Sequence, residues 1–88
     1  MDDTEVFEEI RTLLDQVLQL GGRSIRFSPD TALFGSIPEF DSMAVVSVLT
    51  AIEESFGFVI DDDEISAQAF ETVGSLAYFV SRKVAEEA

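Results

Sequence analysis

Apolar residues recur at intervals of three and four over much of this 88-residue chain, and that spacing constrains its fold more than any other feature. Positions three or four apart lie on one face of an α-helix, so each such run predicts a helix with one apolar face. The first run predicts a helix from about residue 3 to 20, which Gly21-Gly22 ends. Its apolar face consists of Val6, Ile10, Leu13, Leu14, Val17 and Leu18.

Two further runs of the same kind predict the other main helices. The second helix begins at Asp41 or Ser42 and ends near Gly57, and the last helix follows Thr72, whose hydroxyl can cap a helix N-terminus. The predicted core face of the second helix is Val45, Val48, Leu49, Ile52 and Phe56. That of the last helix is Val73, Leu76, Ala77, Val80 and Val84.

Residues 21–40, "GGRSIRFSPDTALFGSIPEF", contain both prolines of the chain and predict a long connection with a short turn near Ala32. A connection of this length is uncommon unless it is anchored or functional. We expect apolar side chains to hold it over the core, namely Ile25, Phe27, Leu33, Phe34 and Ile37. Residues 61–70, "DDDEISAQAF", predict a short helix with an acidic first turn and with Ile65 facing inward.

No segment alternates between apolar and polar residues as a half-buried strand does. "FGFVI", residues 56–60, is the best strand candidate, but it is short and has no obvious partner. We therefore predict an all-α fold, formed by residues 1–88 as a single domain. It is a small four-helix bundle with three main helices, a short third helix and a long first loop.

Charge and composition narrow the classes of partner. Eighteen acidic and five basic residues give a net charge of −13, so nucleic acid and membrane surfaces are disfavoured as partners, while proteins with basic patches are attracted. The apolar content of 47% indicates a packed globule rather than disorder. The chain has no cysteine, no apolar run of bilayer length and an acidic start unlike a signal peptide, so we expect a cytoplasmic protein.

Ser42 is the candidate functional residue because it lies where the extended segment "IPEF" gives way to the second helix. In one interpretation, Asp41 or Ser42 merely caps this helix. In the other, the hydroxyl carries a phosphodiester, since the free N–H groups and the positive end of the helix dipole favour an anion there.

Catalysis by Ser42 itself is disfavoured. A nucleophilic serine needs a base beside its hydroxyl and a group that orients the base. The chain has no His or Cys, and its only amine side chain, Lys83, is near the far terminus, so we predict that the protein is not an enzyme. The acidic run Asp61–Glu64 lacks the spaced oxygens and the turn glycine of a calcium loop, so we predict no metal site.

Met43, Val46 and Thr50 form a partly apolar strip opposite the predicted core face of the second helix. Either the connection or the short helix covers this strip, or it is a recognition surface for a partner protein beside Ser42. The sequence leaves both possibilities open.

Asp41-Ser42-Met43, followed by a helix ending "AIEESFG" and then by "VIDDDEI" and "FETVGSLAYFV", resembles the acyl carrier proteins over the whole chain. The resemblance implies a monomer in which a phosphopantetheinyl transferase attaches 4'-phosphopantetheine from coenzyme A to Ser42, with Asp41 helping to hold Mg²⁺ during the transfer. The thiol of the arm would carry acyl groups as thioesters, so the chain needs no reactive Cys or His of its own.

The resemblance also implies that loading ligases and acyl-transferring enzymes dock their basic patches on the second helix, at Met43, Val46, Ser47, Glu53 and Glu54. Ala44 and Ser47 stand where fatty-acid members usually have acids, and "PEF" replaces a glycine-containing turn before Asp-Ser. These departures favour a specialised pathway over primary fatty acid synthesis. They make the chain most similar to the carriers of exosortase-type exopolysaccharide clusters.

The nature of the cargo leaves alternatives. We expect modest sheltering of an acyl chain between the second and third helices, around Val46, Leu49, Ile60 and Ile65. An aminoacyl or peptidyl carrier is one alternative, because the early turns of the second helix carry little charge. The other is an unmodified acidic protein-interaction domain that binds a basic surface without any cofactor.

Overall fold

The computed structural model describes residues 2–87, without the side chains of Asp62 and Glu87. Within that range the chain is helical, and its only β-type pairing is an isolated bridge between Ala32 and Thr72. The longer helices are α1 (Asp3–Leu18), α3 (Ser42–Phe56) and α4 (Val73–Glu87). Shorter elements lie between them, namely the 3₁₀ turn η1 (Arg23–Arg26), helix α2 (Leu33–Ser36) and the 3₁₀ turns η2 (Asp62–Glu64) and η3 (Ala67–Phe70).

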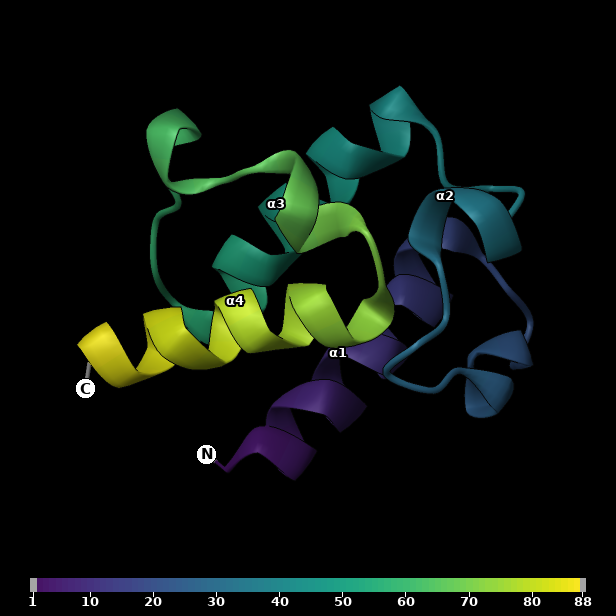
Figure 1. Ribbon diagram of the computed structural model, residues 1–88, viewed down its shortest axis with the longest axis horizontal. Coiled ribbons are helices and arrows are strands. Elements are labelled where there is room, and N and C mark those ends of the chain that lie inside the picture. The colour runs from purple at the N-terminus through teal and green to yellow at the C-terminus, as the bar shows by residue number, and fades with distance from the viewer. Residues whose placement is uncertain (1, 88) are drawn as a thin grey trace.

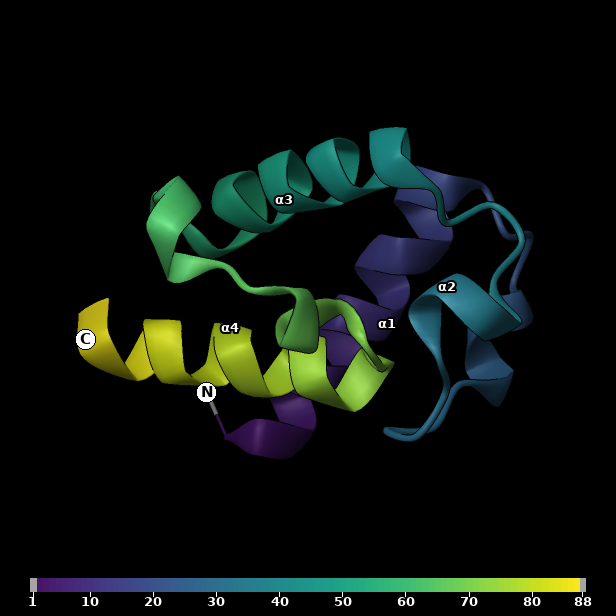
Figure 2. The same ribbon diagram turned by 45° about the horizontal axis from the view of Figure 1, so that its top comes forward.

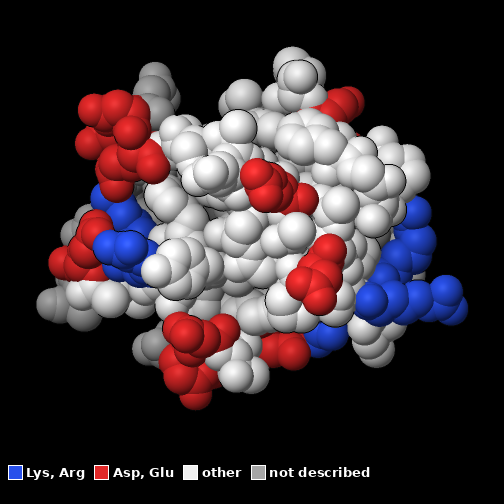
Figure 3. All heavy atoms as spheres, viewed as in Figure 1, with Lys and Arg blue, Asp and Glu red and all other residues white. Residues whose placement is uncertain are grey.

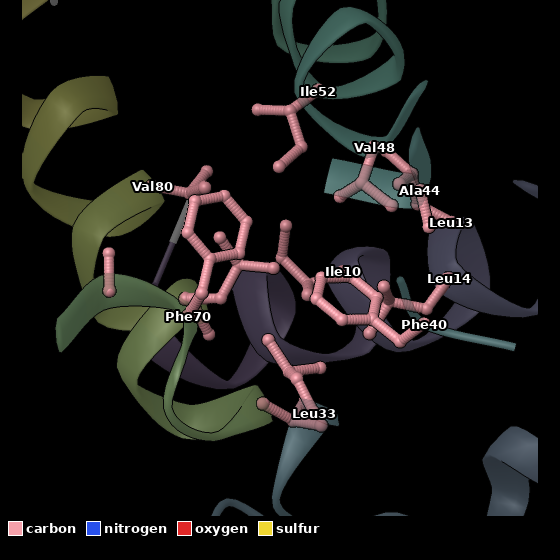
Figure 4. Packing of buried hydrophobic residues seen from close by; sticks show 14 of the residues in the cluster. Ile10, Leu13, Leu14, Leu33, Phe40, Ala44, Val48, Ile52, Phe70 and Val80 are labelled. Atoms are coloured by element: carbon pink, nitrogen blue, oxygen red, sulfur yellow. The ribbon is translucent and has the colours of Figure 1, made fainter. Parts of the chain in front are cut away.

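Helix α1 packs against both α3 and α4, and α2 lies at the end of the molecule where α3 begins (Figures 1 and 2). The buried residues form one hydrophobic core, to which α1 contributes Ile10, Leu13 and Leu14 (Figure 4). The predicted all-α bundle is therefore confirmed.

Helix α1 ends at Leu18, two residues before the predicted end, because Gln19 adopts a left-handed conformation with φ of 54°. The Asp15 carboxylate then accepts backbone N–H groups of Gly22 and Ser24 at 3.0 and 3.1 Å. Hydrogen bonds from Ser24 are the main reason that the pKa of Asp15 lies below its ordinary value. Asp15 thus organises the start of the long connection, a role that its position in a helical run did not reveal.

The long connection is anchored by the N-terminus of α4. Val73 and Gly74 donate their backbone N–H groups to the carbonyls of Thr31 and Pro29, both at 2.9 Å. The first N–H groups of a helix have no partner within it, so the connection satisfies donors that would otherwise lack one. The next N–H of α4, that of Ser75, bonds the Thr72 hydroxyl at 2.9 Å, which confirms the predicted cap.

Only part of the connection covers the core as predicted. Leu33 and Ile37 are buried, and Phe27 packs against the core at its edge. Ile25 and Phe34 were expected to do the same, but they are 75% and 57% exposed. Not all side chains of a short turn can face the core. Ser24, before Ile25, and Leu33, before Phe34, occupy the inward positions.

The buried face of α3 is rotated by one residue from the predicted one. Ala44, Val48 and Ile52 form its centre at intervals of four, whereas Val45 and Leu49 are only partly buried against the core. Ala44 was missed because a small alanine adds little to an apolar pattern, although its side chain is buried.

Residues 61–70 form two 3₁₀ turns rather than the predicted helix, because Ile65 between them is extended at φ −95° and ψ 141°. Ile65 does pack against the core, as predicted. The Glu64 carboxylate accepts the Asp61 backbone N–H at 3.1 Å and binds the Lys83 ammonium at 2.7 Å, which fastens this segment to α4.

The Lys83–Glu64 pair predicts an acid-dependent loss of stability. The hydrogen bond from Lys83 is the main reason that the pKa of Glu64 lies below its ordinary 4.5. A carboxylate whose folded pKa is depressed stabilises the fold above the unfolded pKa and loses that contribution as the pH falls through the folded pKa. We therefore expect Glu64→Gln to lower the melting temperature at neutral pH and to differ little from the native chain well below pH 4.5, as measured by thermal unfolding. Exposed Glu9→Gln is the control, and a Glu64→Gln deficit that is constant with pH would contradict the assignment.

Candidate functional site

Ser42 is the first residue of α3, and its side chain is exposed to solvent. The preceding residue, Asp41, is the N-cap: it is extended, and its Oδ1 accepts the backbone N–H of Ala44 at 2.9 Å. The N–H groups of Ser42 and Met43 have no acceptor within the helix, since the hydrogen-bond ladder begins at Val45. The site therefore combines an accessible hydroxyl with N–H groups and a helix dipole that favour an attached anion.

The segment before Ser42 is held from two sides. Phe40 is buried, and its ring lies 4.7 Å from that of Phe34 and 6.1 Å from that of Phe70. Glu39 forms an ion pair with Arg23 of η1, which holds the pKa of Glu39 below its ordinary value. Neither contact was predicted, although an aromatic residue two positions before an exposed serine is a signal that could have indicated an anchor.

The two roles of Asp41 can be separated by substitution. Asparagine caps a helix about as well as aspartate, whereas replacing such a cap by alanine costs about 1 kcal/mol. We expect Asp41→Ala to lower the unfolding free energy by about this amount, and Asp41→Asn to leave it nearly unchanged. Both variants should slow modification of Ser42 if the carboxylate charge assists the transfer through Mg²⁺. Transferase rates and urea unfolding measure the two effects, and full activity of Asp41→Asn would leave only the capping role.

An apolar hollow of about 500 Å³ lies between α2, the first turn of α3 and η3. Helix α3 contributes Val45 to it, three residues after Ser42 and so on the same side of the helix. Among the described residues that line it, Glu71 is the only charged one. The lining residues are Ala32, Phe34, Gly35, Val45, Ala67, Phe70 and Glu71.

The predicted sheltering residues lie elsewhere. Val46 is 62% exposed and does not line the hollow, because it points about 100° away from Val45 around the helix. Leu49, Ile60 and Ile65 pack against the core and do not line this hollow either. A separate hollow of about 580 Å³, around the Lys83–Glu64 pair, contains no residue of α3 and is not part of the Ser42 site.

The predicted strip on α3 is not covered by the rest of the chain. Met43 is 76% exposed, and Val46, Ser47 and Thr50 are also exposed. On the face drawn in Figure 3, much of the surface over α2 and η3 is also uncharged, with acidic residues standing apart from one another. The structure thus removes the interpretation in which the connection or the short helix buries the strip.

The two acids predicted for docking differ in their surroundings. Glu54 is exposed, whereas the Glu53 carboxylate accepts the backbone N–H of Ile60 at 2.7 Å. Glu53 therefore stabilises the turn that follows α3, a structural role that the sequence did not reveal.

Among the described side chains, no group of three acids is placed to hold a metal ion; the side chain of Asp62, within the acidic run, lies outside that description. No helix in the described range is long and apolar enough to span a membrane.

Comparison with known proteins agrees with this geometry. A family model for a phosphopantetheine attachment site matches residues 8–80. An acyl carrier protein of Guillardia theta is 33% identical over 85 residues, which cover 97% of this chain and 99% of that protein. The solution NMR structure of a holo acyl carrier protein from Nitrosomonas europaea is 56% identical, with a TM-score of 0.83, and the match covers 90% of this chain and 95% of that one.

The helical fold and the matched family model define a protein of the phosphopantetheine-attachment class. Within that class, the chain belongs to the acyl carrier protein family. Members of this family are carriers rather than enzymes, as the sequence predicts, and their cofactor is covalently attached 4'-phosphopantetheine. The family implies interaction with a phosphopantetheinyl transferase and with acyl-handling enzymes.

Proposed function

We propose that this protein carries acyl groups on a 4'-phosphopantetheine arm attached to Ser42 and presents them to partner enzymes of a specialised pathway. The observation that carries the proposal is the exposed Ser42 hydroxyl at the N-terminus of α3, inside the region matched by the family model. The arm supplies a thiol on which acyl groups are held as thioesters.

The residues around Ser42 have separate tasks in this proposal. The N–H groups of Ser42 and Met43 and the dipole of α3 stabilise the negative charge of the attached phosphodiester. Asp41 holds the first turn of the helix through Ala44 and assists the transferase through Mg²⁺. Phe40 anchors the preceding segment, so the hydroxyl is presented at a fixed position.

The apolar hollow supports the proposal that the cargo is an acyl group. An acyl chain at the thiol end of the arm can fold back against Val45 and the apolar surfaces of α2 and η3. Burial of apolar area stabilises a carrier by about 0.8 kcal/mol for each fully buried methylene. The sheltering surface that we propose is therefore centred on Val45 rather than on Val46.

The exposed strip on α3 supports the proposal that the partner enzymes are specialised ones. Met43, Val46 and Ser47 carry no charge, so this face offers shape and apolar contact where a strongly acidic face would offer charge. Glu54 is left as the exposed acid at the far end of the strip for a basic residue of a partner. Because the whole chain has a net charge of −13, the encounter itself is still favoured for basic partners.

Incubation with a broad-specificity phosphopantetheinyl transferase and coenzyme A tests the proposal. We expect the intact mass to increase by one phosphopantetheine group. The holo protein is then offered to fatty acyl and aminoacyl adenylating ligases, and thioester formation is read by mass. Loading with amino acids alone would favour the aminoacyl carrier, whereas an unchanged mass with a competent transferase would favour the unmodified interaction domain.

A further inference from the structure

Three of the five basic residues of this chain lie together at η1. Arg23 and Arg26 are the ends of this 3₁₀ turn, in which side chains three positions apart project from the same side. Arg11 of α1 donates to the carbonyl of Ile25 at 3.4 Å, and the Ile25 side chain is 75% exposed. We call Arg23, Ile25 and Arg26 the arginine patch, and Figure 3 shows basic side chains gathered at the end of the molecule where η1 lies.

The guanidinium groups of the arginine patch keep N–H donors to spare. Each arginine has five such donors. Arg23 uses its Nε on the Leu20 carbonyl at 2.9 Å and its Nη2 on the Glu39 carboxylate, whereas the exposed Arg26 forms no hydrogen bond or ion pair with another described residue. Both arginines line a hollow of about 320 Å³, and none of the described residues that line it is acidic, although the chain has eighteen acids. The hollow therefore offers donors to an anionic group of another molecule.

The arginine patch borders the Ser42 site. Glu39, which pairs with Arg23, is three residues before Ser42, and three residues of chain span at most about 11 Å. A typical interface covers about 800 Å² on each partner, a surface roughly 30 Å across. An enzyme that surrounds Ser42 with an interface of this size therefore reaches the arginine patch as well.

The charge of the arginine patch indicates the chemistry of the surface that it fits. The net charge of −13 repels nucleic acid and anionic membranes from the chain as a whole, so the anionic groups are carboxylates of a protein. The first turn of α3 carries no acid that could attract a basic partner there. Arginine is also among the residues that contribute most to binding at protein interfaces. The arginine patch thus supplies a charge contact that the start of α3 lacks.

We propose that the arginine patch docks the ligase that loads the arm, and that this ligase presents Asp or Glu side chains to Arg23 and Arg26 and an apolar surface to Ile25. This inference rests on the proposed function, because it requires an arm on Ser42. Loading is the step at which the cargo is chosen, so discrimination between carriers at this step keeps a wrong cargo off the arm. A carrier that lacks the arginines leaves the acids of the ligase unpaired.

The test measures loading of the holo protein by the adenylating ligase of its own organism that forms the thioester, with the carrier as the varied substrate. Arg26→Glu raises KM about tenfold and Arg26→Gln about threefold, with kcat little changed, because a charge at the edge of an interface acts on encounter and binding. The ratio of variant to native KM falls towards one as salt screens the charges. Arg26 is the position to change because Arg23 also holds Leu20 and Glu39.

Arg82→Glu is the matched control. Arg82 is also an exposed arginine, and its replacement changes the net charge by the same amount, but it lies on α4 and lines the separate hollow around the Lys83–Glu64 pair. Its KM stays at the native value. Arg26→Lys provides a second measurement, since it supplies an amine that a carbodiimide couples to a neighbouring carboxylate. The expected cross-linked peptide contains an Asp or Glu of the ligase.

A KM that falls for Arg26→Glu would overturn the inference, because it would reveal a basic surface opposite the arginine patch. An unchanged KM would overturn it too, as would binding of the native chain, but not of Arg26→Glu, to vesicles of anionic phospholipid. Failure of Ser42 to accept the arm is read separately, from the intact mass before loading. That outcome contradicts the proposed function and this inference with it, whereas normal loading with an unmoved KM contradicts only the inference.

Discussion

Replacing Ser42 by alanine abolishes the addition of phosphopantetheine while leaving the fold intact. The side chain is exposed, and the N-cap bond of α3 comes from Asp41 rather than from Ser42, so losing the hydroxyl removes no contact that stabilises the helix. We expect the melting temperature to change little, since exposed substitutions usually alter the unfolding free energy by no more than about 0.5 kcal/mol. Intact mass after incubation with transferase and coenzyme A reads the first effect, and thermal unfolding reads the second.

Ser55→Ala is the matched control for this experiment. Ser55 is also an exposed serine of α3, but it lies in the last turn, away from the positive end of the helix. The Ser55→Ala variant should be modified at the native rate. Modification of Ser42→Ala at another serine, or a loss of modification in both variants, would contradict the assignment of Ser42.

Replacing Gly74 by alanine destabilises the fold by about 2 kcal/mol, because the added Cβ overpacks a closely packed site. The Cβ would lie 2.6 Å from the carbonyl oxygen of Pro29, the same oxygen that accepts the Gly74 N–H. Alanine is intrinsically better than glycine in a helix by at most about 1 kcal/mol, so the clash outweighs the gain. A loss of this size lowers the melting temperature of a small domain by roughly 10 °C, which thermal unfolding can measure.

Gly35→Ala separates the clash from the helix propensity. Gly35 also lies near the start of a helix, but a Cβ there meets only the Ala32 Cβ at an ordinary 3.5 Å. This variant should be neutral or slightly more stable than the native chain. If Gly74→Ala is equally neutral, the long connection is not held against α4 as the structure shows.

The helical periodicity of the sequence predicts α1, α3 and α4 well, because each helix buries an apolar face that leaves a regular pattern. It predicts the depth of burial less well. Whether Ala44 or Val45 lies at the centre of the buried face of α3 depends on how α3 packs against α1. A pattern of apolar residues does not specify that packing. For the same reason, the apolar Ile25 and Phe34 were expected inside although both are exposed.

The candidate site was predictable where it depends on local chemistry. An aspartate and a serine between an extended segment and a helix indicate a cap and an exposed hydroxyl, and the structure has both at Asp41 and Ser42. The hollow and the ring contacts of Phe40 were not predictable, because Phe34, Phe40 and Phe70 come together only through tertiary packing. The hydrogen bond between Glu53 and Ile60 was not predictable either, because it depends on the path of the chain after α3.

The most direct test of the carrier assignment is the mass of the protein purified from the organism that makes it, followed by fragmentation that locates any added group. We predict an increase of one phosphopantetheine arm, with or without an acyl group, on the fragment that contains Ser42. A protein that is wholly unmodified in its own cells, or that bears the arm on a different serine, would contradict the account.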